Sequence, residues 1–162
     1  MAILSVGQSA PRFSLSGIDG KSYTLNQNGA RLTLAVFFKI TCPTCAMTFP
    51  FLEKLHQTYR GAGLAVWGIS QDDKPSSIQF AGTNGSTFPI LIDAGYRTSR
   101  TYDPEFVPTG VLVDSDGKIV DNLVAFNKAQ LNHISQTVAG RLGVPAAIVA
   151  PEDDGKPAFR PG

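Results

Sequence analysis

Apolar residues along this chain recur with two different periods, and the change from one period to the other marks a strand followed by a helix. Residues 32–38 are nearly all apolar, which is typical of a central strand buried on both faces of a sheet. After Pro43, apolar residues recur at helical spacing as far as Tyr59. This predicts a helix that stops at Gly61 and Gly63, and that Pro50 either kinks or divides into a short first turn and a main helix.

Shorter patterns of the same two kinds predict the remaining elements. Alternating residues around a turn at 18–21 predict a hairpin over residues 8–25. Further strands are expected over residues 64–70, 88–93, 109–113 and 118–125, and helical segments over 75–81, 96–102 and 128–142. This order predicts an α/β fold in which a central mixed sheet carries helices on both faces and an N-terminal hairpin extension.

The last twelve residues differ in composition from the rest. Residues 151–162 contain three prolines and two glycines, which predicts an irregular C-terminal tail with Phe159 as an anchor. Residues 1–150 are then expected to form one domain, as the length of 162 residues suggests.

Composition and charge narrow the function classes. The chain is 43% hydrophobic and 17% charged, as expected of a soluble globular protein, and we expect a monomer. Its net charge of +1 offers no electrostatic footprint for nucleic acid or an anionic membrane. No run approaches the roughly 20 apolar residues of a membrane span, and the first residues lack a secretory signal. These features predict a cytoplasmic location, with a periplasmic or extracytoplasmic one if a signal or anchor has been removed.

Cys42 and Cys45, the only cysteines, lie where the predicted buried strand meets the predicted helix. A helix N-terminus stabilises a thiolate, which is the form that attacks disulfides. Cys42 would hold that place and face solvent, and Cys45 would lie behind it in the first turn. We therefore predict that Cys42 attacks a substrate disulfide and that Cys45 resolves the mixed disulfide.

The two cysteines could also bind zinc or form a purely structural disulfide. A zinc site needs about four ligands, and beyond the cysteines only His56 and His133 are available, without paired spacing. A purely structural disulfide closing so short a loop would add only about 2 kcal/mol. A Cys-x-x-Cys pair between a strand and a helix favours redox function, so we expect neither a metal nor a cofactor.

The residues also carry a family resemblance over most of positions 8–142. The chain resembles the thioredoxin-like redoxins of the AhpC/TSA superfamily, and most closely the TlpA/ResA-type thiol–disulfide oxidoreductases. The matching motifs are Cys-Pro-Thr-Cys at 42–45, Ala-Pro-Arg-Phe-Ser-Leu at 10–15, Asp-Gly-Lys at 19–21, Pro50, Val-Pro-Thr at 107–109 and Asp-Ser-Asp-Gly-Lys at 114–118. The resemblance implies a thioredoxin-like fold, protein disulfides as substrates and a thiol as electron donor.

The resemblance also implies how a substrate would be held. Pro108 should be cis and pack beside the dithiol, which would leave the backbone of Val107 free to pair with an extended substrate segment. Thr41 and Pro43, on either side of Cys42, are the other expected substrate contacts. The alternative is a trans proline that simply opens a strand.

Three departures from the family pattern concern the surroundings of the cysteines. Many relatives have Trp where this chain has Thr41, a buried Asp where it has Val36, and a Glu where it has Thr48. Both usual carboxylates are therefore missing, and no proton acceptor for Cys45 is identified. Lys39 either favours the thiolate electrostatically or is a solvated charge at a strand end.

The predicted function is a thiol–disulfide oxidoreductase acting on protein disulfides, with the reductase direction favoured by a cytoplasmic location. One alternative is a peroxidase of the peroxiredoxin type. Its Pro-x-x-x-Thr-x-x-Cys pattern is absent, because Lys39 and Ala35 occupy the Thr and Pro positions relative to Cys42. The other alternative is a redox-sensing binding module that uses the dithiol as a switch.

Overall fold

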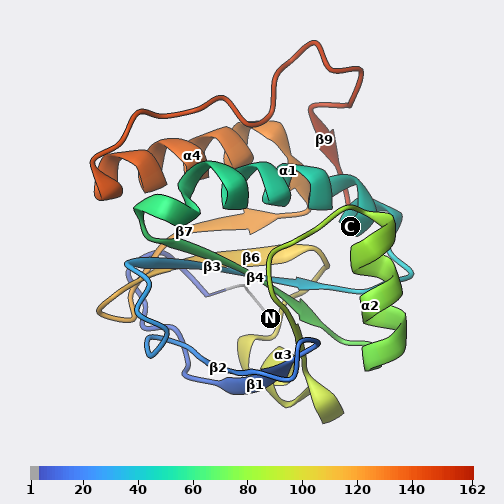
Figure 1. Cartoon of the computed structure of the whole chain (residues 1–162). Helices are drawn as coiled ribbons and strands as arrows, with labels where there is room; N and C mark the ends of the chain where they lie inside the picture. The colour runs from blue at the N-terminus through green and yellow to red at the C-terminus, as the bar shows by residue number, and fades with distance from the viewer. Residues whose placement is uncertain (1–3) are drawn as a thin grey trace.

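The computed structural model describes residues 4–162 and is built around a mixed seven-stranded sheet (Figure 1). Across the sheet the strands follow the order β2 (Ser22–Thr24), β1 (Ser14–Gly17), β5 (Ile90–Ile92), β4 (Leu64–Ser70), β3 (Leu32–Phe38), β6 (Thr109–Asp114) and β7 (Ile119–Val124). In the central part of the sheet, β3 runs parallel to β4 and antiparallel to β6. The predicted α/β class, mixed sheet and N-terminal hairpin are confirmed.

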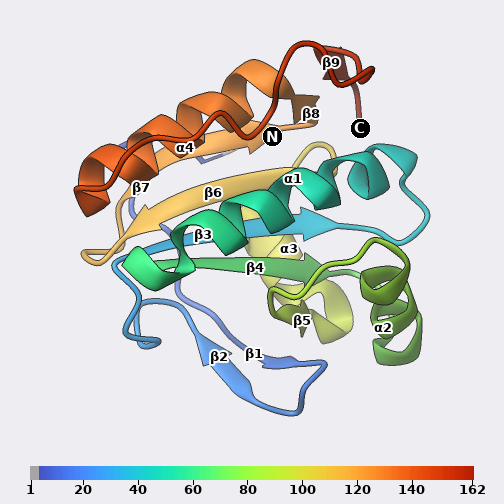
Figure 2. The ribbon, with the colours of Figure 1, turned by 45° about the horizontal axis from the view of Figure 1, so that its top comes forward.

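Helices cover both faces of the sheet. The two long helices, α1 (Pro43–Tyr59) and α4 (Lys128–Leu142), lie on one face, and α3 (Arg97–Tyr102) lies on the other (Figures 1 and 2). The fourth, α2 (Lys74–Thr83), lies at one end of the molecule, and two short 3₁₀ turns, η1 (Arg60–Ala62) and η2 (Ala94–Tyr96), complete the set. Within residues 4–162, none of the helices is long and apolar enough to cross a membrane.

The central strand β3 shows why its sequence is continuously apolar. All seven of its residues are buried. Leu34, Val36 and Phe38 join the core cluster under α1 and α4, whereas Ala35 and Phe37 join the cluster on the opposite face. Successive side chains of a strand point to opposite faces, so a strand covered on both sides needs apolar residues at every position.

The following helix begins directly after Cys42. Cys42 is its N-cap and Pro43 its first residue, where a missing N–H costs no hydrogen bond. Pro50 lies inside α1, which is assigned as one helix from Pro43 to Tyr59, so the prediction of a separate first turn is wrong. The 3₁₀ turn η1 then ends at Gly63, whose φ of 122° lies in the region that favours glycine.

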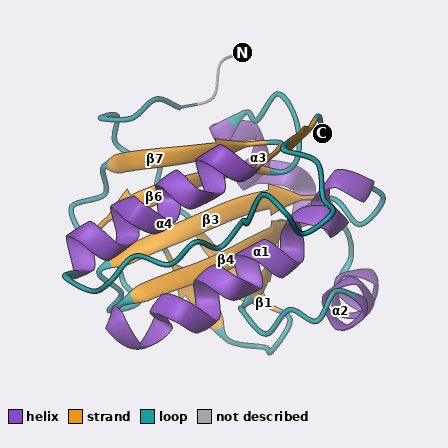
Figure 3. Ribbon diagram, turned by 90° about the horizontal axis from the view of Figure 1, so that it is seen from above, coloured by secondary structure: helices purple, strands orange, loops and turns teal. Residues whose placement is uncertain are grey.

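After α4 the chain returns along the α1–α4 layer towards the start of α1 (Figures 1 and 3). Its first part is fixed by Val149 and Ala150, which are buried. Its last part contains a short strand, β9 (Phe159–Arg160), which pairs with β8 (Phe126–Asn127). The tail is thus not wholly irregular, and Phe159 is 53% exposed, so the prediction that it is an anchor is wrong. The division at residue 150 stays a prediction.

Candidate active site

Cys42 lies at the junction of β3 and α1 and closes the first turn of the helix. Its backbone is extended, with φ −99° and ψ 108°, and its Sγ accepts a hydrogen bond from the backbone N–H of Cys45 at 3.1 Å. The side chain is half-buried and the thiol is free. The sulfur thus receives an N–H donor and lies at the N-terminal end of α1, where unpaired backbone N–H groups point.

Cys45 has the opposite environment, since it is fully buried. Burial raises the pKa of its thiol, and the hydrogen bond with Cys42 raises it further. The backbone and the charge of Lys39 act in the opposite direction but do not offset these effects. Lys39 is itself exposed, as expected of a solvated charge at a strand end, and its charge acts on the thiol of Cys45. At neutral pH Cys45 is therefore held as an uncharged thiol.

The segment before β6 forms the opposite wall of the site. The Val107–Pro108 peptide bond is cis, as the resemblance implied, and the trans alternative is wrong. The carbonyl oxygen of Val107 lies 3.5 Å from Cys42 Sγ, which donates to it, although the two residues are 65 positions apart. Thr109 Oγ1 donates to the Phe106 carbonyl at 2.6 Å and closes this turn. The fold thus joins the two motifs that the sequence singled out.

The backbone of Val107 is not open, because the end of the tail lies against it. A Cβ added at Gly162 would overlap the carbonyl oxygen of Val107. Next to it, Thr44 Oγ1 donates to the carbonyl of Pro161 at 2.6 Å. Nothing in the sequence pattern indicated this contact, since the tail reaches the site through backbone atoms.

A second residue missed by the sequence analysis is Asp72. Its Oδ2 accepts a hydrogen bond from the backbone N–H of Ile40 at 2.9 Å, two residues before Cys42. The neighbouring Asp73 caps α2 by accepting from Ser76 N at 2.8 Å. The sequence gave no means of assigning Asp72 to the loop that carries Cys42.

The other sequence-predicted positions divide into a rim and a core. Thr41 and Pro43 are exposed beside Cys42, while Val36 is buried in the core. Thr48 is buried and its Oγ1 donates to the Thr44 carbonyl at 2.7 Å. Neither Val36 nor Thr48 therefore offers Cys45 a carboxylate.

Neither cysteine belongs to a cluster of potential metal ligands within the described residues. Over residues 4–162 no three His, Cys, Asp or Glu side chains lie close enough to hold a metal ion. One cavity, of about 660 Å³, lies between β1 and α3, and its lining includes Arg12, Asp93, Arg97 and Tyr102 but neither cysteine. A second cavity, of about 370 Å³, lies close to the dithiol, since Ile40 and Ala46 are in its lining.

The chain is similar in sequence to known proteins. The family model described as Redoxin matches residues 5–138. The thiol–disulfide oxidoreductase ResA of Bacillus anthracis is 26% identical over 122 residues, which are 75% of this chain and 70% of that protein.

Two solved structures are also similar. One, from Chlorobium tepidum and assigned as the thiol:disulfide interchange protein DsbE, has a TM-score of 0.78 and 26% identity, covering 86% of this chain and 99% of that one. The other, from Bacteroides thetaiotaomicron and assigned as a protein disulfide isomerase, has a TM-score of 0.81 and 26% identity, covering 88% and 95%. The sheet and helices described above are therefore those of the thioredoxin-like fold.

Proposed function

The chain belongs to the redoxin family and is a thiol–disulfide oxidoreductase, and we propose that Cys42 and Cys45 carry out its exchange with protein disulfides. The observation that carries the proposal is the contrast between the two thiols of one helical turn. Cys42 is half-buried and receives the N–H of Cys45, whereas Cys45 is fully buried behind it. Such a pair supplies one nucleophile that a substrate can reach and one that it cannot.

The exchange proceeds in two displacements. The Cys42 thiolate attacks one sulfur of the substrate disulfide, a Cys42–substrate bond forms, and the other substrate sulfur leaves as a thiolate. Cys45 then loses its proton and attacks Cys42 Sγ, which releases the second substrate thiol and forms the Cys42–Cys45 disulfide. Two electrons pass from the dithiol to the substrate, and a thiol donor of the cell restores the dithiol.

Four residues around Cys42 are proposed to contact the substrate. Thr41 and Pro43 are exposed on one side of the sulfur, and Val107 and Pro108 form the opposite wall. The Val107 carbonyl lies within reach of Cys42 Sγ, so a peptide that brings its disulfide to Cys42 must pass this backbone. Backbone pairing there would hold an extended substrate regardless of its side chains.

The direction of transfer and its setting are also proposals. Net reduction of substrate disulfides follows if the chain acts in the cytoplasm, where thiols are kept reduced. An extracytoplasmic location, the alternative drawn from the sequence, would suit a reductase with few partners. The monomeric state and the identity of the electron donor stay predictions, and an equilibrium titration against glutathione would give the direction.

The peroxidase alternative has no supporting observation in the site. A peroxidase of that type uses a threonine hydroxyl beside its reactive cysteine. Two threonines of α1 near the cysteines, Thr44 and Thr48, both donate their hydroxyl hydrogens to carbonyl oxygens. Neither of these two can hold a peroxide oxygen without giving up that bond, and Thr41, next to Cys42, lies outside the Pro-x-x-x-Thr-x-x-Cys spacing.

Trapping of the mixed disulfide tests the proposed roles. In Cys45→Ser the first displacement still takes place but the second cannot, so a covalent complex with a protein disulfide substrate should accumulate through Cys42. Cys42→Ser is the matched control and should form no complex. The complex is detected by non-reducing electrophoresis and mass spectrometry. Full turnover by Cys45→Ser would contradict the resolving role of Cys45.

A further inference from the structure

The last residues of the chain lie over the wall of the site that a substrate would use. The carbonyl of Pro161 accepts from Thr44, which lies between the two cysteines in sequence. Gly162 lies so close to the Val107 carbonyl that a side chain there would overlap it, and the Cβ of Phe106 is the next neighbour. Two separate contacts thus place this segment beside Cys42.

A short ladder holds the segment in place. Phe159 and Arg160 form β9, which pairs antiparallel with Asn127 and Phe126 of β8. Immediately before it, the carbonyl of Ala158 accepts from the backbone N–H of Lys128 at 3.0 Å. Because β8 leads directly into α4, these contacts join the tail to the rigid part of the domain.

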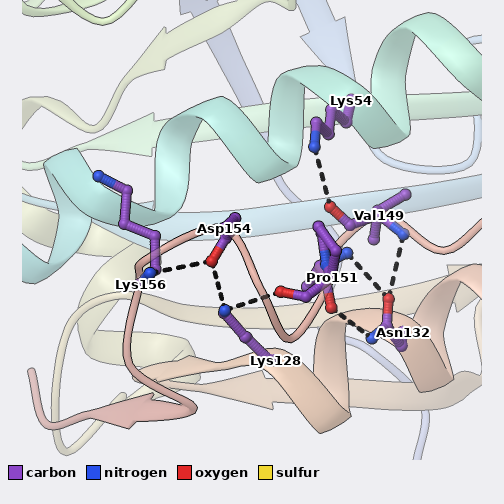
Figure 4. Close-up of polar contacts among 8 residues, drawn as sticks. Lys54, Lys128, Asn132, Val149, Pro151, Asp154 and Lys156 are labelled. Atoms are coloured by element: carbon purple, nitrogen blue, oxygen red, sulfur yellow. Dashed lines mark hydrogen bonds and ion pairs between the residues drawn. The ribbon is translucent and has the colours of Figure 1, made fainter.

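Lys128 also holds the preceding loop, and it does so from a buried position. Its side chain is 7% exposed, and its Nζ donates to the Pro151 carbonyl at 2.8 Å and to Asp154 Oδ1 at 2.5 Å (Figure 4). Both ends of the loop of residues 151–158 are therefore bonded to Lys128, the first through its Nζ and the last through its backbone N–H. A buried ammonium needs such partners, so releasing the loop has a cost in free energy.

The attachment continues back along the tail. Asn132 on α4 bonds the backbone of Val149 and Ala150, and Lys54 on α1 donates to the Val149 carbonyl at 3.4 Å (Figure 4). The tail is thus fastened to both long helices before it reaches the site. In contrast, nearly all side chains of residues 152–162 are exposed.

We propose that residues 159–162 are a built-in cover of the substrate-docking wall, held closed by the strap of residues 151–158 and displaced when a protein substrate reaches Cys42. Gly162 of the cover lies against the Val107 carbonyl, with which an extended peptide would otherwise pair. It leaves Cys42 half-exposed, so it excludes large partners and admits small molecules.

The contacts of the cover allow it to open without unfolding the domain. Residues 159–162 bury no large apolar side chain, since Phe159 is 53% exposed and the contacts of Pro161 and Gly162 are to their backbone. Segments with few buried apolar contacts open at low free energy. Apparent affinity for a large partner is reduced by the fraction of molecules that are open.

The test compares the access of a small and a large thiol reagent to Cys42. The reduced protein is treated with N-ethylmaleimide or with a maleimide carrying a long polyethylene glycol chain, and the two alkylation rates are measured. Cys45 is fully buried and does not compete. The ratio of the large-reagent rate to the small-reagent rate reports access alone, because thiolate reactivity cancels. It does not depend on disulfide exchange, so it can fail while the proposed function stands.

Two variants open the cover in independent ways, and each has a matched control. Gly162→Leu cannot keep its contact with Val107, while Gly140→Leu places the same side chain on α4 where no atom lies within 4 Å. Asp154→Asn removes the charge that pairs with Lys128, while Asp153→Asn removes the adjacent exposed charge, which makes no hydrogen bond within residues 4–162.

The proposal predicts that the ratio rises by about tenfold in both cover variants, as when a minor open form becomes the major one, and stays at the wild-type value in both controls. An unchanged ratio in Gly162→Leu would overturn the proposal, and so would equal acceleration of both reagents, which would reflect thiolate reactivity rather than access. If Asp154→Asn fails to fold, Gly162→Leu alone decides.

Discussion

The surroundings of Cys42, here called the rim, and those of Cys45, the layer below it, lie within one helical turn. They differ in burial and in hydrogen-bond partners. The rim is half-exposed, is bordered by backbone carbonyls and receives an N–H donor. The layer below it is fully buried, and burial raises the pKa of the Cys45 thiol. The two thiols therefore differ in access and in surroundings, although only two residues separate them.

This difference shows how a single turn can order two chemical steps. A thiol that an incoming disulfide can reach, as Cys42 can, reacts first. A thiol that is buried and protonated does not compete with it for substrate, but it is already beside the sulfur that it must attack in the second step. Substitutions and pH changes that act on one of the two thiols should therefore affect one step and not the other.

Removal of the rim thiol should have the largest effect. Cys42→Ser leaves a hydroxyl that is not a nucleophile towards disulfides. Reduction of the disulfides of insulin, or of a mixed disulfide between a protein and glutathione, should therefore fall to the uncatalysed background. Turnover is followed by the appearance of free thiols. Cys45→Ser differs, because it should still complete the first displacement. Equal loss of the first displacement in both variants would remove the distinction between the thiols.

The second effect concerns the pH dependence of resolution. Burial raises the pKa of Cys45, so only a small thiolate fraction exists at neutral pH. The rate of mixed-disulfide decay should therefore rise by about tenfold per pH unit below that pKa, because the thiolate is the attacking form. Rapid-mixing measurements on the preformed mixed disulfide give this rate. A profile that is flat above neutral pH would show that Cys45 is already ionised.

The third effect concerns stability at alkaline pH. Because the pKa of Cys45 is raised in the folded protein, the native state keeps a proton that the unfolded chain releases. The stabilising contribution is complete below the unfolded thiol pKa of about 8.5 and is lost as pH rises through the interval up to the folded value, by up to about 1.4 kcal/mol per pH unit.

Urea unfolding of the reduced protein at several pH values measures this effect. The free energy of unfolding of the wild type should fall more steeply with pH than that of Cys45→Ser. Burial also raises the pKa of Tyr102, but that residue is common to both proteins, so the difference between the two slopes reports Cys45. Parallel slopes would show that Cys45 does not titrate differently in the folded state.

The smallest effect comes from the loop that positions Cys42. Asp72→Ala removes the bond to Ile40 N and should slow the first displacement several-fold, with a loss of about 1 kcal/mol of stability. Asp73→Ala is the matched control, since loss of the α2 cap costs a similar amount, about 1 kcal/mol, without touching that loop. Equal exchange rates in the two variants would show that Asp72 has no positioning role.

The parts of this molecule that were predictable from sequence are those set by local periodicity. The apolar run of β3 and the helical spacing of α1 follow from burial on two faces and on one stripe, and both were predicted. The same reasoning placed Cys42 at the start of the helix. The cis Pro108 was implied by a family motif rather than by the period of the sequence.

The parts that were not predictable depend on contacts between a side chain and a distant backbone atom. Asp72 reaches Ile40 across 32 residues, and Thr44 reaches Pro161 across 117. Neither contact leaves a pattern in the sequence, because one partner of each is a main-chain atom, which every residue has. The expectation that Phe159 anchors the tail was wrong for the same reason, since polar contacts of Lys128 and Asn132 hold it instead.

The central claim is that the dithiol reacts with protein disulfides in preference to other oxidants. The direct measurement mixes fully reduced protein with a protein disulfide and, separately, with hydrogen peroxide, and compares the second-order rates at which Cys42 is oxidised. The account predicts a fast reaction with the disulfide and a slow one with peroxide. A faster reaction with peroxide would contradict it and would identify a peroxidase that works without the usual threonine.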